Sequence, residues 1–317
     1  MRPHFDERTA LLTRRRWLLS AIVASAWPAT ARAAPGPAIA TRTIPASGEA
    51  LPVIGLGSWI TFNVGNDRVA QDACADVLQA FFAAGGRMVD SSPMYGSSQA
   101  TIGHGLARPG AGKPPVFAAD KVWIGSGRGD TRGPEQIERS RRLWGVPRFD
   151  LLQVHNLLDW EVHLPTLLAM KAAGQLRYVG LTTSEGRRHR VVEAILRSQS
   201  VDFVQLSYNP LDREAEQRLL PLAVERGIAV IANRPFREGA LLRALQRQPP
   251  PAWAASELGC DGWAQFVLKY IVSHPAVTCA IPATTSVAHV RQNLGAGRGP
   301  MPDAALRRRM AAHIAAL

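Results

Sequence analysis

Short apolar runs alternate with windows of helical periodicity along most of this 317-residue chain, and this alternation limits the possible folds more than any other feature. Eight runs occur: LPVIGLG, RMVD, PVFAADKVW, FDLLQVH, RYVGLTT, VDFVQLSY, GIAVIANR and AVTCAIPA. The helical windows between them include residues 69–84, 134–144, 164–173, 188–196, 214–225 and 262–273. Nearly continuous apolar runs are typical of parallel strands covered on both faces, and such strands are joined by crossover helices. We therefore predict an α/β fold.

The number of strand and helix units narrows this prediction. Eight units favour a closed (β/α)8 TIM barrel over an open sheet. The preceding TRTIPASGEALPV segment predicts an N-terminal β-hairpin with its turn near Ser47 and Gly48. The alternative is a doubly wound sheet, but no GxGxxG follows the first run, and GLGSW holds only two glycines.

The first 33 residues have the order of features found in a signal peptide. Arg14, Arg15 and Arg16 precede an apolar run over residues 17–27, and Ala31 and Ala33 then form a small-x-small cleavage pattern. This is typical of a twin-arginine signal, and the run is shorter than the roughly 20 residues that span a bilayer. We expect a signal peptide over 1–33 and a single barrel domain over 34–317. The expected route is folded export by the twin-arginine (Tat) translocase to the periplasm, without a stable membrane anchor; the alternative is a disordered basic tail.

Charge and cysteines exclude several classes of function. The formal net charge is +12, but the basic residues are scattered apart from GRRHR and RRRM. Clusters this short are typical of solvated helix faces, so we expect no nucleic-acid partner. Cys74, Cys260 and Cys279 are odd in number and form no CxxC pair, so we expect no metal site and no disulfide framework. Cys74 and Cys279 are expected to be buried.

Four ionisable residues stand at or just after the ends of consecutive predicted strands. Asp90 ends the second run, Tyr95 follows it, Lys121 ends the third and His155 ends the fourth. Each alone has an ordinary explanation, such as a turn residue, a lysine that reaches solvent or a histidine of the core. In a barrel, however, the C-terminal strand ends converge on one mouth, where catalytic groups lie.

The chemistry of these four groups indicates proton transfer to a carbonyl oxygen. A phenol titrates near 10 and needs a nearby cation to stabilise its phenolate, which Lys121 can supply. A lysine near an apolar interior needs a counter-charge, for which Asp90 is the candidate. His155, neutral or charged, can polarise the same carbonyl oxygen.

Seven motifs in the correct order resemble the aldo-keto reductase superfamily, NAD(P)H-dependent (β/α)8 enzymes, over about residues 40 to 298. They are LPVIGLGSW, VDSSPMYGSSQATIGHGL, DKVW, LLQVH, VGLTT, VDFVQLSYNPL and AIPATTSVAHVRQNLGA. By this resemblance Tyr95 is the proton donor of a catalytic tetrad made of Asp90, Tyr95, Lys121 and His155.

The resemblance also implies cofactor contacts. Thr182 and Thr183 stand where the family usually has a Ser-Asn pair, and Asn233 stands where an aromatic residue commonly stacks on the nicotinamide. NADPH is expected to be favoured, with NADH possible, because Arg291 is the cation nearest to the place of the 2′-phosphate. The implied cofactor-binding residues are Gly57, Ser58, Asp90, Thr182, Thr183, Gln205, Asn233, Arg234, Phe236, Thr284, Thr285, Arg291, Gln292 and Asn293.

The substrate site is implied by aromatic positions. Trp59 and Trp123 match residues that wall the family's substrate pocket beside Tyr95 and His155, and residues 124–133 and 237–259 are expected to shape the rest. The expected function is an exported, monomeric, NADP-dependent oxidoreductase for a small carbonyl substrate. The alternative is a cofactor-binding sensor or interaction subunit with slow turnover. A glycosidase would need a pair of facing carboxylates, and only Asp90 qualifies.

Overall fold

The computed structural model of the protein describes residues 38–108, 116–124 and 132–317. The expected signal peptide, with cleavage before Ala34, and most of the expected substrate loop 124–133 lie outside the described residues. Eight parallel strands form one sheet in the order of the chain, and each lies within one of the eight apolar runs. The strands are β3 (Leu56–Gly57), β4 (Met88–Asp90), β5 (Phe117–Val122), β6 (Leu151–Val154), β7 (Tyr178–Thr182), β8 (Phe203–Ser207), β9 (Ala229–Asn233) and β10 (Val277–Ala280).

The sheet closes into a barrel, as predicted. Parallel bridges pair Ile54 with Ala280 and Gly57 with Ala283, which joins the first strand to the last. The amide of Gly55 donates to Ala280 O at 2.8 Å. A Cβ atom on Gly57 would lie 2.7 Å from Ile281 O, so the backbones at this seam approach each other too closely for any larger residue.

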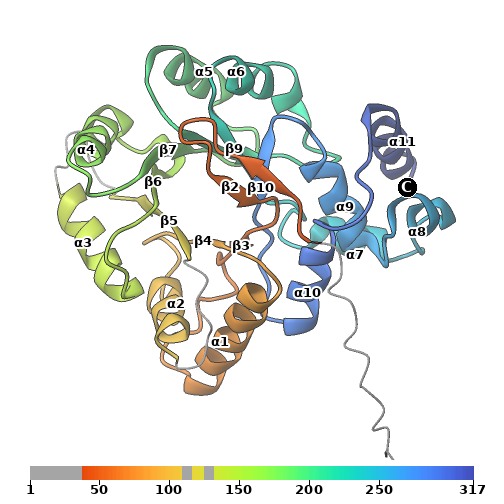
Figure 1. The fold of residues 1–317 in the computed structure, drawn as a ribbon, viewed down its shortest axis with the longest axis horizontal. Helices are drawn as coiled ribbons and strands as arrows, with labels where there is room; N and C mark the ends of the chain where they lie inside the picture. The colour runs from red at the N-terminus through yellow and green to blue at the C-terminus, as the bar shows by residue number, and fades with distance from the viewer. Residues whose placement is uncertain (1–37, 109–115, 125–131) are drawn as a thin grey trace, which may run out of the picture. The chain divides into compact units, whose positions relative to one another are not determined.

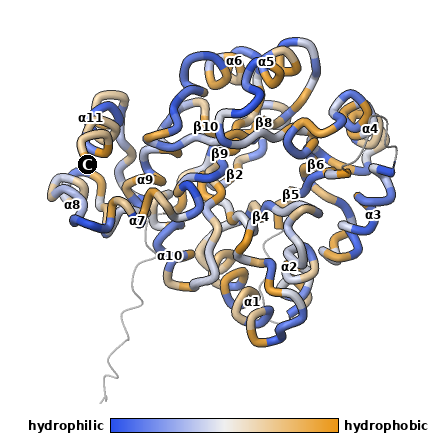
Figure 2. The backbone as a smooth tube through the Cα atoms, turned by 180° about the vertical axis from the view of Figure 1, so that it is seen from behind, coloured by the Kyte–Doolittle hydropathy of each residue, from blue (hydrophilic) through white to orange (hydrophobic). Residues whose placement is uncertain are grey.

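Helices surround the barrel (Figure 1). Figure 2 shows that they alternate between hydrophobic and hydrophilic residues along their length, as expected for helices with one face against a core. The helices are α1 (Arg68–Ala83), α2 (Ser98–Ala107), α3 (Gly133–Trp144), α4 (Trp160–Ala172), α5 (His189–Ser198), α6 (Leu219–Glu225), α7 (Ala240–Leu245), α8 (Ala252–Leu258), α9 (Trp263–Val272), α10 (Val287–Gly295) and α11 (Ala304–Ala315). Among the described residues, no helix is long and apolar enough to cross a membrane.

Two differences from the sequence-based helices have local causes. The window 214–225 is not one helix: a 3-10 turn over Glu214–Glu216 precedes α6, and Arg218 between them has non-helical backbone angles. Helix α2 lies outside the windows that periodicity singled out. Its Gly103 would place a Cβ atom 2.0 Å from Leu143 O in α3, so glycine permits the close packing of α2 and also hides its apolar pattern.

The predicted hairpin covers one end of the barrel (Figure 1). Strands β1 (Thr41–Thr43) and β2 (Ala50–Pro52) pair in antiparallel register, with Gly48 at a φ of +76° in the turn. Ile44 and Leu51 are fully buried against the barrel interior. Glu49 accepts bonds from Arg87 and from Arg177 and Tyr178, which fixes the hairpin at the N-terminal strand ends. The opposite end of the barrel is left for the site.

Candidate active site

The four predicted ionisable residues come together at the C-terminal end of the barrel. Asp90 ends β4, Lys121 lies in β5 and His155 directly follows β6. Tyr95 lies in the loop between β4 and α2. Their exposed fractions are 2%, 1%, 4% and 9% for Asp90, Lys121, His155 and Tyr95, so all four groups act in a medium with little water.

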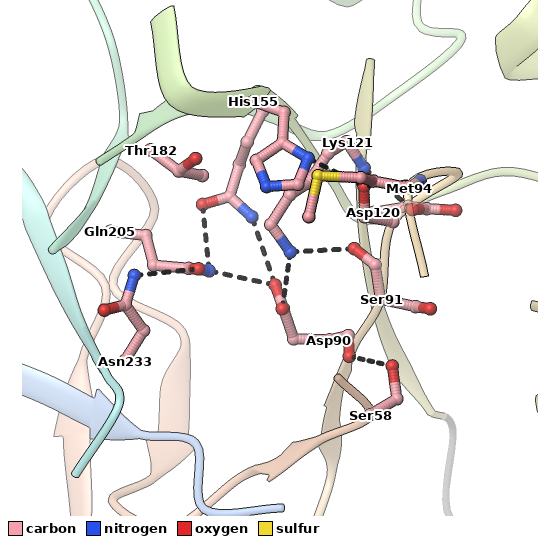
Figure 3. A network of polar contacts seen from close by, with 12 residues as sticks. Ser58, Asp90, Ser91, Met94, Asp120, Lys121, His155, Thr182, Gln205 and Asn233 are labelled. Carbon is pink, nitrogen blue, oxygen red and sulfur yellow. Dashed lines mark hydrogen bonds and ion pairs between the residues drawn. The ribbon is translucent and has the colours of Figure 1, made fainter. Parts of the chain in front are cut away.

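Lys121 and Asp90 form a buried ion pair. Lys121 Nζ donates to Asp90 Oδ2 at 2.5 Å and to the carbonyl oxygen of Ser91 at 2.7 Å (Figure 3). Burial alone would lower the pKa of Lys121, but the charge and hydrogen bond of Asp90 outweigh burial and raise the pKa above its usual value. Lys121 is therefore a charged ammonium, and Asp90 is its counter-charge as the sequence predicts.

Tyr95 is a buried phenol beside this ammonium. Lys121 Nζ lies 5.1 Å from the centroid of the Tyr95 ring. Burial raises the pKa of Tyr95, and the positive charge of Lys121 offsets this only in part, so the net shift is upward. The phenol thus keeps its proton at neutral pH and is able to donate it.

His155 is a neutral imidazole. Burial, and to a smaller extent the charge of Lys121, lower the pKa of His155 to about 3. Its Nδ1 atom lies 2.8 Å from the hydroxyl oxygen of Ser92. Of the two protonation states considered from the sequence, the neutral one fits this environment.

Side-chain amides orient Asp90, two of them directly and one through another amide. Its Oδ1 atom accepts from Gln205 Nε2 at 2.9 Å and from Gln153 Nε2 at 3.3 Å. Asn233 Nδ2 in turn donates to Gln205 Oε1 at 3.3 Å and to the carbonyl oxygen of Thr183 at 2.9 Å. Figure 3 shows this chain of polar contacts running from Asn233 through Gln205 to Asp90.

A pocket of about 970 Å³ opens beside these groups. Its volume lies at the upper end of the range for ligand and cofactor sites. The predicted residues that line it are Gly57, Ser58, Trp59, Asp90, Tyr95, His155, Thr182, Gln205, Asn233, Arg234, Phe236, Thr284, Gln292 and Asn293.

Five predicted residues do not line this pocket within the described part of the chain: Lys121, Trp123, Thr183, Thr285 and Arg291. Lys121 contacts it through Asp90, whereas Thr183 Oγ1 donates to the carbonyl oxygen of Arg187 at 2.5 Å and so stabilises its own loop. Trp123 is partly exposed, and its amide donates to Gln136 Oε1 at 2.7 Å. Thr285 and Arg291 are exposed.

The match to a protein-family model identifies the family of this chain. The model of the aldo/keto reductase family matches residues 53–311, most of the chain. The chain belongs to the aldo/keto reductase family. It is therefore an oxidoreductase by family, with a nicotinamide cofactor.

Individual relatives of this aldo/keto reductase are distant. Methylglyoxal reductase YeaE of Escherichia coli (strain K12) is 25% identical over 263 residues, which is 80% of this chain and 88% of that protein. NADH-specific methylglyoxal reductase of the same organism is 25% identical over 232 residues, 63% of this chain and 68% of that protein. An aldo-keto reductase of Klebsiella pneumoniae in complex with NADPH has a TM-score of 0.71 at 20% identity, over 87% of this chain and 96% of that one. The structural likeness shows the (β/α)8 fold.

Several charged side chains line the pocket of this aldo/keto reductase. Arg234 Nη1 pairs with Glu185 Oε1 at 3.1 Å and with Glu238. All three side chains line the pocket, together with Arg187. An anion that binds here meets guanidinium groups which are already paired, so it must share them with the two carboxylates.

Sequence reasoning missed Gln153 and Ser92 in this aldo/keto reductase site. Gln153 is fully buried in β6, and it interrupts the apolar run LLQVH two residues before His155. Because side chains alternate along a strand, a polar residue two before a catalytic one lies on the same face, which was the available signal. Ser92 stands in an ordinary turn sequence and gave no such signal. Within the described residues no group of three or more potential metal ligands occurs.

Proposed function

We propose that this aldo/keto reductase reduces an aldehyde or ketone to an alcohol with NADPH, with Tyr95 as the proton donor. The observation that carries this proposal is the protonated phenol of Tyr95, buried between a charged ammonium and a neutral imidazole at the wall of the pocket. A phenol in this setting is a proton source that needs no nucleophile and no metal ligand set.

The pocket residues fit a nicotinamide dinucleotide. Such a cofactor presents a carboxamide, a diphosphate and ribose hydroxyl groups, and the pocket offers amides, guanidinium groups and hydroxyl groups in return. Gln205 uses one amide hydrogen on Asp90 and one carbonyl lone pair on Asn233. A side-chain amide has two of each, but Gln205 Nε2 also donates to Gln153 Oε1 at 3.5 Å, so one lone pair of Gln205 remains for the carboxamide. Arg234 and Phe236 would lie along the diphosphate, and Thr284, Gln292 and Asn293 along the adenosine.

The chain's own residues handle the proton. When bound, the reduced nicotinamide supplies a hydride to the carbonyl carbon. The carbonyl oxygen takes the phenolic proton of Tyr95: the O–H bond of Tyr95 breaks as the O–H bond of the alcohol forms, which leaves a phenolate. Lys121 stabilises this phenolate by its charge, and Asp90 keeps Lys121 charged. His155 donates a hydrogen bond to the same oxygen and orients it.

Replacing the proton donor tests the proposal. Tyr95→Phe should lower the reduction rate of p-nitrobenzaldehyde by about 10² to 10⁴, the usual contribution of a general acid. Binding of NADPH, followed by nucleotide fluorescence, should be almost unchanged. Methylglyoxal should be assayed in parallel, because two relatives are named as methylglyoxal reductases. Activity above half of the wild-type rate in Tyr95→Phe would contradict the proposal, and a wild type that binds NADPH without turnover would favour the sensor alternative.

The preference for NADPH over NADH rests on a cation near the 2′-phosphate. Arg291 is the residue that the resemblance suggests, whereas His289 lines the pocket. A charge-assisted contact contributes about 1.5 to 3 kcal/mol, so we expect Arg291→Ala to weaken NADPH by roughly 10-fold or more and to leave NADH unchanged. Fluorescence titration of both nucleotides measures this. Loss in His289→Ala alone would move the phosphate contact to His289, and equal wild-type affinities would contradict the preference.

Export is proposed from the sequence alone. Residues 1–33 would direct a folded protein, with its cofactor inside, through the twin-arginine translocase to the periplasm, and 34–317 would be the monomeric barrel domain. Replacing Arg14 and Arg15 with lysine should keep the precursor in the cytoplasm, as fractionation would measure. Unchanged export of that variant would contradict the proposed route, and a mass above one chain in light scattering would contradict the monomer.

A further inference from the structure

The hydroxyl group of Ser92 contacts the side chain of His155 but has no part in the proton transfer described above. Ser92 lies two residues after Asp90, in the loop that also carries Tyr95. Its side chain is fully buried, and its Oγ atom lies 2.8 Å from His155 Nδ1. The amide of Met94 donates to the same Oγ atom at 3.2 Å. These two contacts decide where the hydroxyl hydrogen points.

A serine hydroxyl has one hydrogen and two lone pairs. Met94 occupies one lone pair. If Nδ1 of His155 carried a hydrogen, it would occupy the other lone pair, and the hydroxyl hydrogen of a fully buried Ser92 would have no acceptor among its contacts in the described structure. A buried donor without an acceptor is costly. The arrangement that satisfies every atom has Ser92 Oγ–H donating to Nδ1.

We propose that Ser92 is a positioning residue: its hydroxyl donates to Nδ1 of His155, so that the neutral imidazole carries its hydrogen on Nε2. The two ring nitrogens cannot both be acceptors in a neutral imidazole, so an acceptor at Nδ1 requires a donor at Nε2. This inference rests on the proposed function for its catalytic meaning, since only there does His155 donate to a carbonyl oxygen.

The backbone after His155 is fixed as well. The amide of Asn156 donates to Thr182 Oγ1 at 2.9 Å, although Asn156 has a left-handed φ of +52°. His155 is therefore held at its ring by Ser92 and at the next peptide by Thr182. A serine in the loop of Asp90 and Tyr95 thus links the orientation of the imidazole to that of the acid and the phenol.

The tautomer has a direct chemical consequence. With the hydrogen on Nε2, His155 attracts a carbonyl oxygen; with the hydrogen on Nδ1, a lone pair on Nε2 repels it. Without Ser92 both tautomers become accessible. We expect Ser92→Ala to lower kcat/KM for reduction by roughly 10-fold, less than the 10² to 10³ seen when a hydrogen-bond donor to a developing charge is removed outright. The affinity for NADPH should not change.

The test reads the tautomer directly, without turnover. In protein labelled with ¹⁵N-histidine, two-bond ¹H–¹⁵N NMR spectra show which ring nitrogen carries the hydrogen, and His155→Asn assigns the signal among the eight histidines. The wild type should show hydrogen on Nε2, and this measurement needs no variant to fold. Ser92→Ala should show a mixture or hydrogen on Nδ1, and the pH midpoint of His155 should rise, since a bond that favours the neutral form is lost.

Two further variants separate a positioning role from a structural one. Ser98→Ala is the matched control, because Ser98 is equally buried in the adjoining helix, bonds only Ser91 among the side chains and does not touch His155. It should keep the Nε2 hydrogen and the wild-type midpoint. Ser92→Thr retains the hydroxyl and should restore both. Hydrogen on Nδ1 in the wild type, or an unchanged tautomer and midpoint in folded Ser92→Ala, would overturn the inference. Failure of the Tyr95→Phe assay would overturn the proposed function and leave the tautomer result untouched.

Discussion

At the scale of single residues, one environment keeps two different groups uncharged. Burial raises the pKa of Tyr95 and lowers that of His155, because in each case the charged form loses its hydration. Lys121 in the same place stays charged because Asp90 touches it. The site therefore holds a protonated donor, a neutral donor and a fixed positive charge at neutral pH.

In the proposed reaction Tyr95 and Lys121 form one proton-transfer unit, so the effects of their loss should not add. Lys121→Met should cost about as much rate as Tyr95→Phe, and the double variant little more than either. Stopped-flow reduction of p-nitrobenzaldehyde, scaled to folded protein, measures this. Lys269→Met is the matched control: Lys269 is also buried, but it bonds the carbonyl oxygens of Arg298 and Pro300. It should lose stability and keep its rate. Fully additive losses would show two independent contributions.

The pKa directions predict a broad pH profile. In the proposed reaction Tyr95 must be protonated to act, and its raised pKa keeps it protonated until above its usual value near 10. His155 has a pKa of about 3, so its protonation state does not change at pH values well above 3. We expect kcat/KM for reduction to show no titration of either group from about pH 5 to about pH 9. A midpoint near 6.5 that disappears in His155→Asn would contradict the assigned environment of His155.

At the scale of elements, alternation along the strands explains which predicted residues reach the site. Thr182 lines the pocket and Thr183 does not, since neighbouring residues of a strand end face opposite ways. In helix α10 successive side chains turn by about 100° instead, and Arg291 lies on its exposed face while Gln292 and Asn293 line the pocket. The sequence predicted the tetrad because each member ends or follows an apolar run. It did not separate inward from outward neighbours where two polar residues stand together.

Strand β5 presents a buried carboxyl group on its other face, and this predicts a pH-dependent stability. Asp120 is fully buried and accepts from Gln99 Nε2 at 2.7 Å, and burial raises its pKa to about 7. In the unfolded chain the group ionises near 4, so stability falls as the pH rises from about 4 to about 7 and then levels off, by roughly 3 to 5 kcal/mol in all.

Asp120→Asn removes the ionisable group and should abolish this part of the pH dependence. Urea unfolding of the two proteins between about pH 5 and about pH 8 measures the difference. The amide keeps one oxygen for Gln99 but loses the second, which accepts from the amide of Lys121 at 2.8 Å, so the variant should be the less stable protein at pH 5 and the difference should narrow towards pH 8. Parallel pH curves for wild type and variant would show that Asp120 does not titrate in this range.

At the scale of the whole molecule, the two ends of the barrel differ in character. The hairpin and the ion pairs of Glu49 close the N-terminal end. All nine described residues other than glycine that have a positive φ follow the C-terminal ends of strands, and Ile60 is one of them. Such backbone conformations cost energy and persist only where the surrounding structure fixes them, and they cluster at functional sites. The alternation of eight strand and helix units predicted the barrel. It did not predict that one end is closed by ion pairs and the other carries the loops with positive φ, because this difference arises from tertiary contacts.

This division predicts that stability and activity can be changed separately. Glu49→Ala removes the acceptor of Arg87, Arg177 and Tyr178 at the closed end, and should lower the free energy of unfolding by about 1 to 3 kcal/mol. The value of kcat should be unchanged, because Glu49 lies at the far end of the barrel from Tyr95. Thermal unfolding and steady-state kinetics measure both quantities. A fall in kcat that matches the loss of stability would show that the two ends are coupled.

The pairing of the first barrel strand with the last one means that the pocket can form only late in protein synthesis. Ile54 is among the first residues of the barrel to leave the ribosome and Ala280 among the last, yet they pair directly. Ile281, which follows at the seam, lines the pocket, as do Thr284 and Asn293. A nascent chain that stops before this point has an open sheet and lacks one wall of the pocket proposed to bind the cofactor. Nucleotide binding by stalled chains of increasing length should therefore begin only when α10 has emerged, which makes cofactor capture a late event in the life of each molecule.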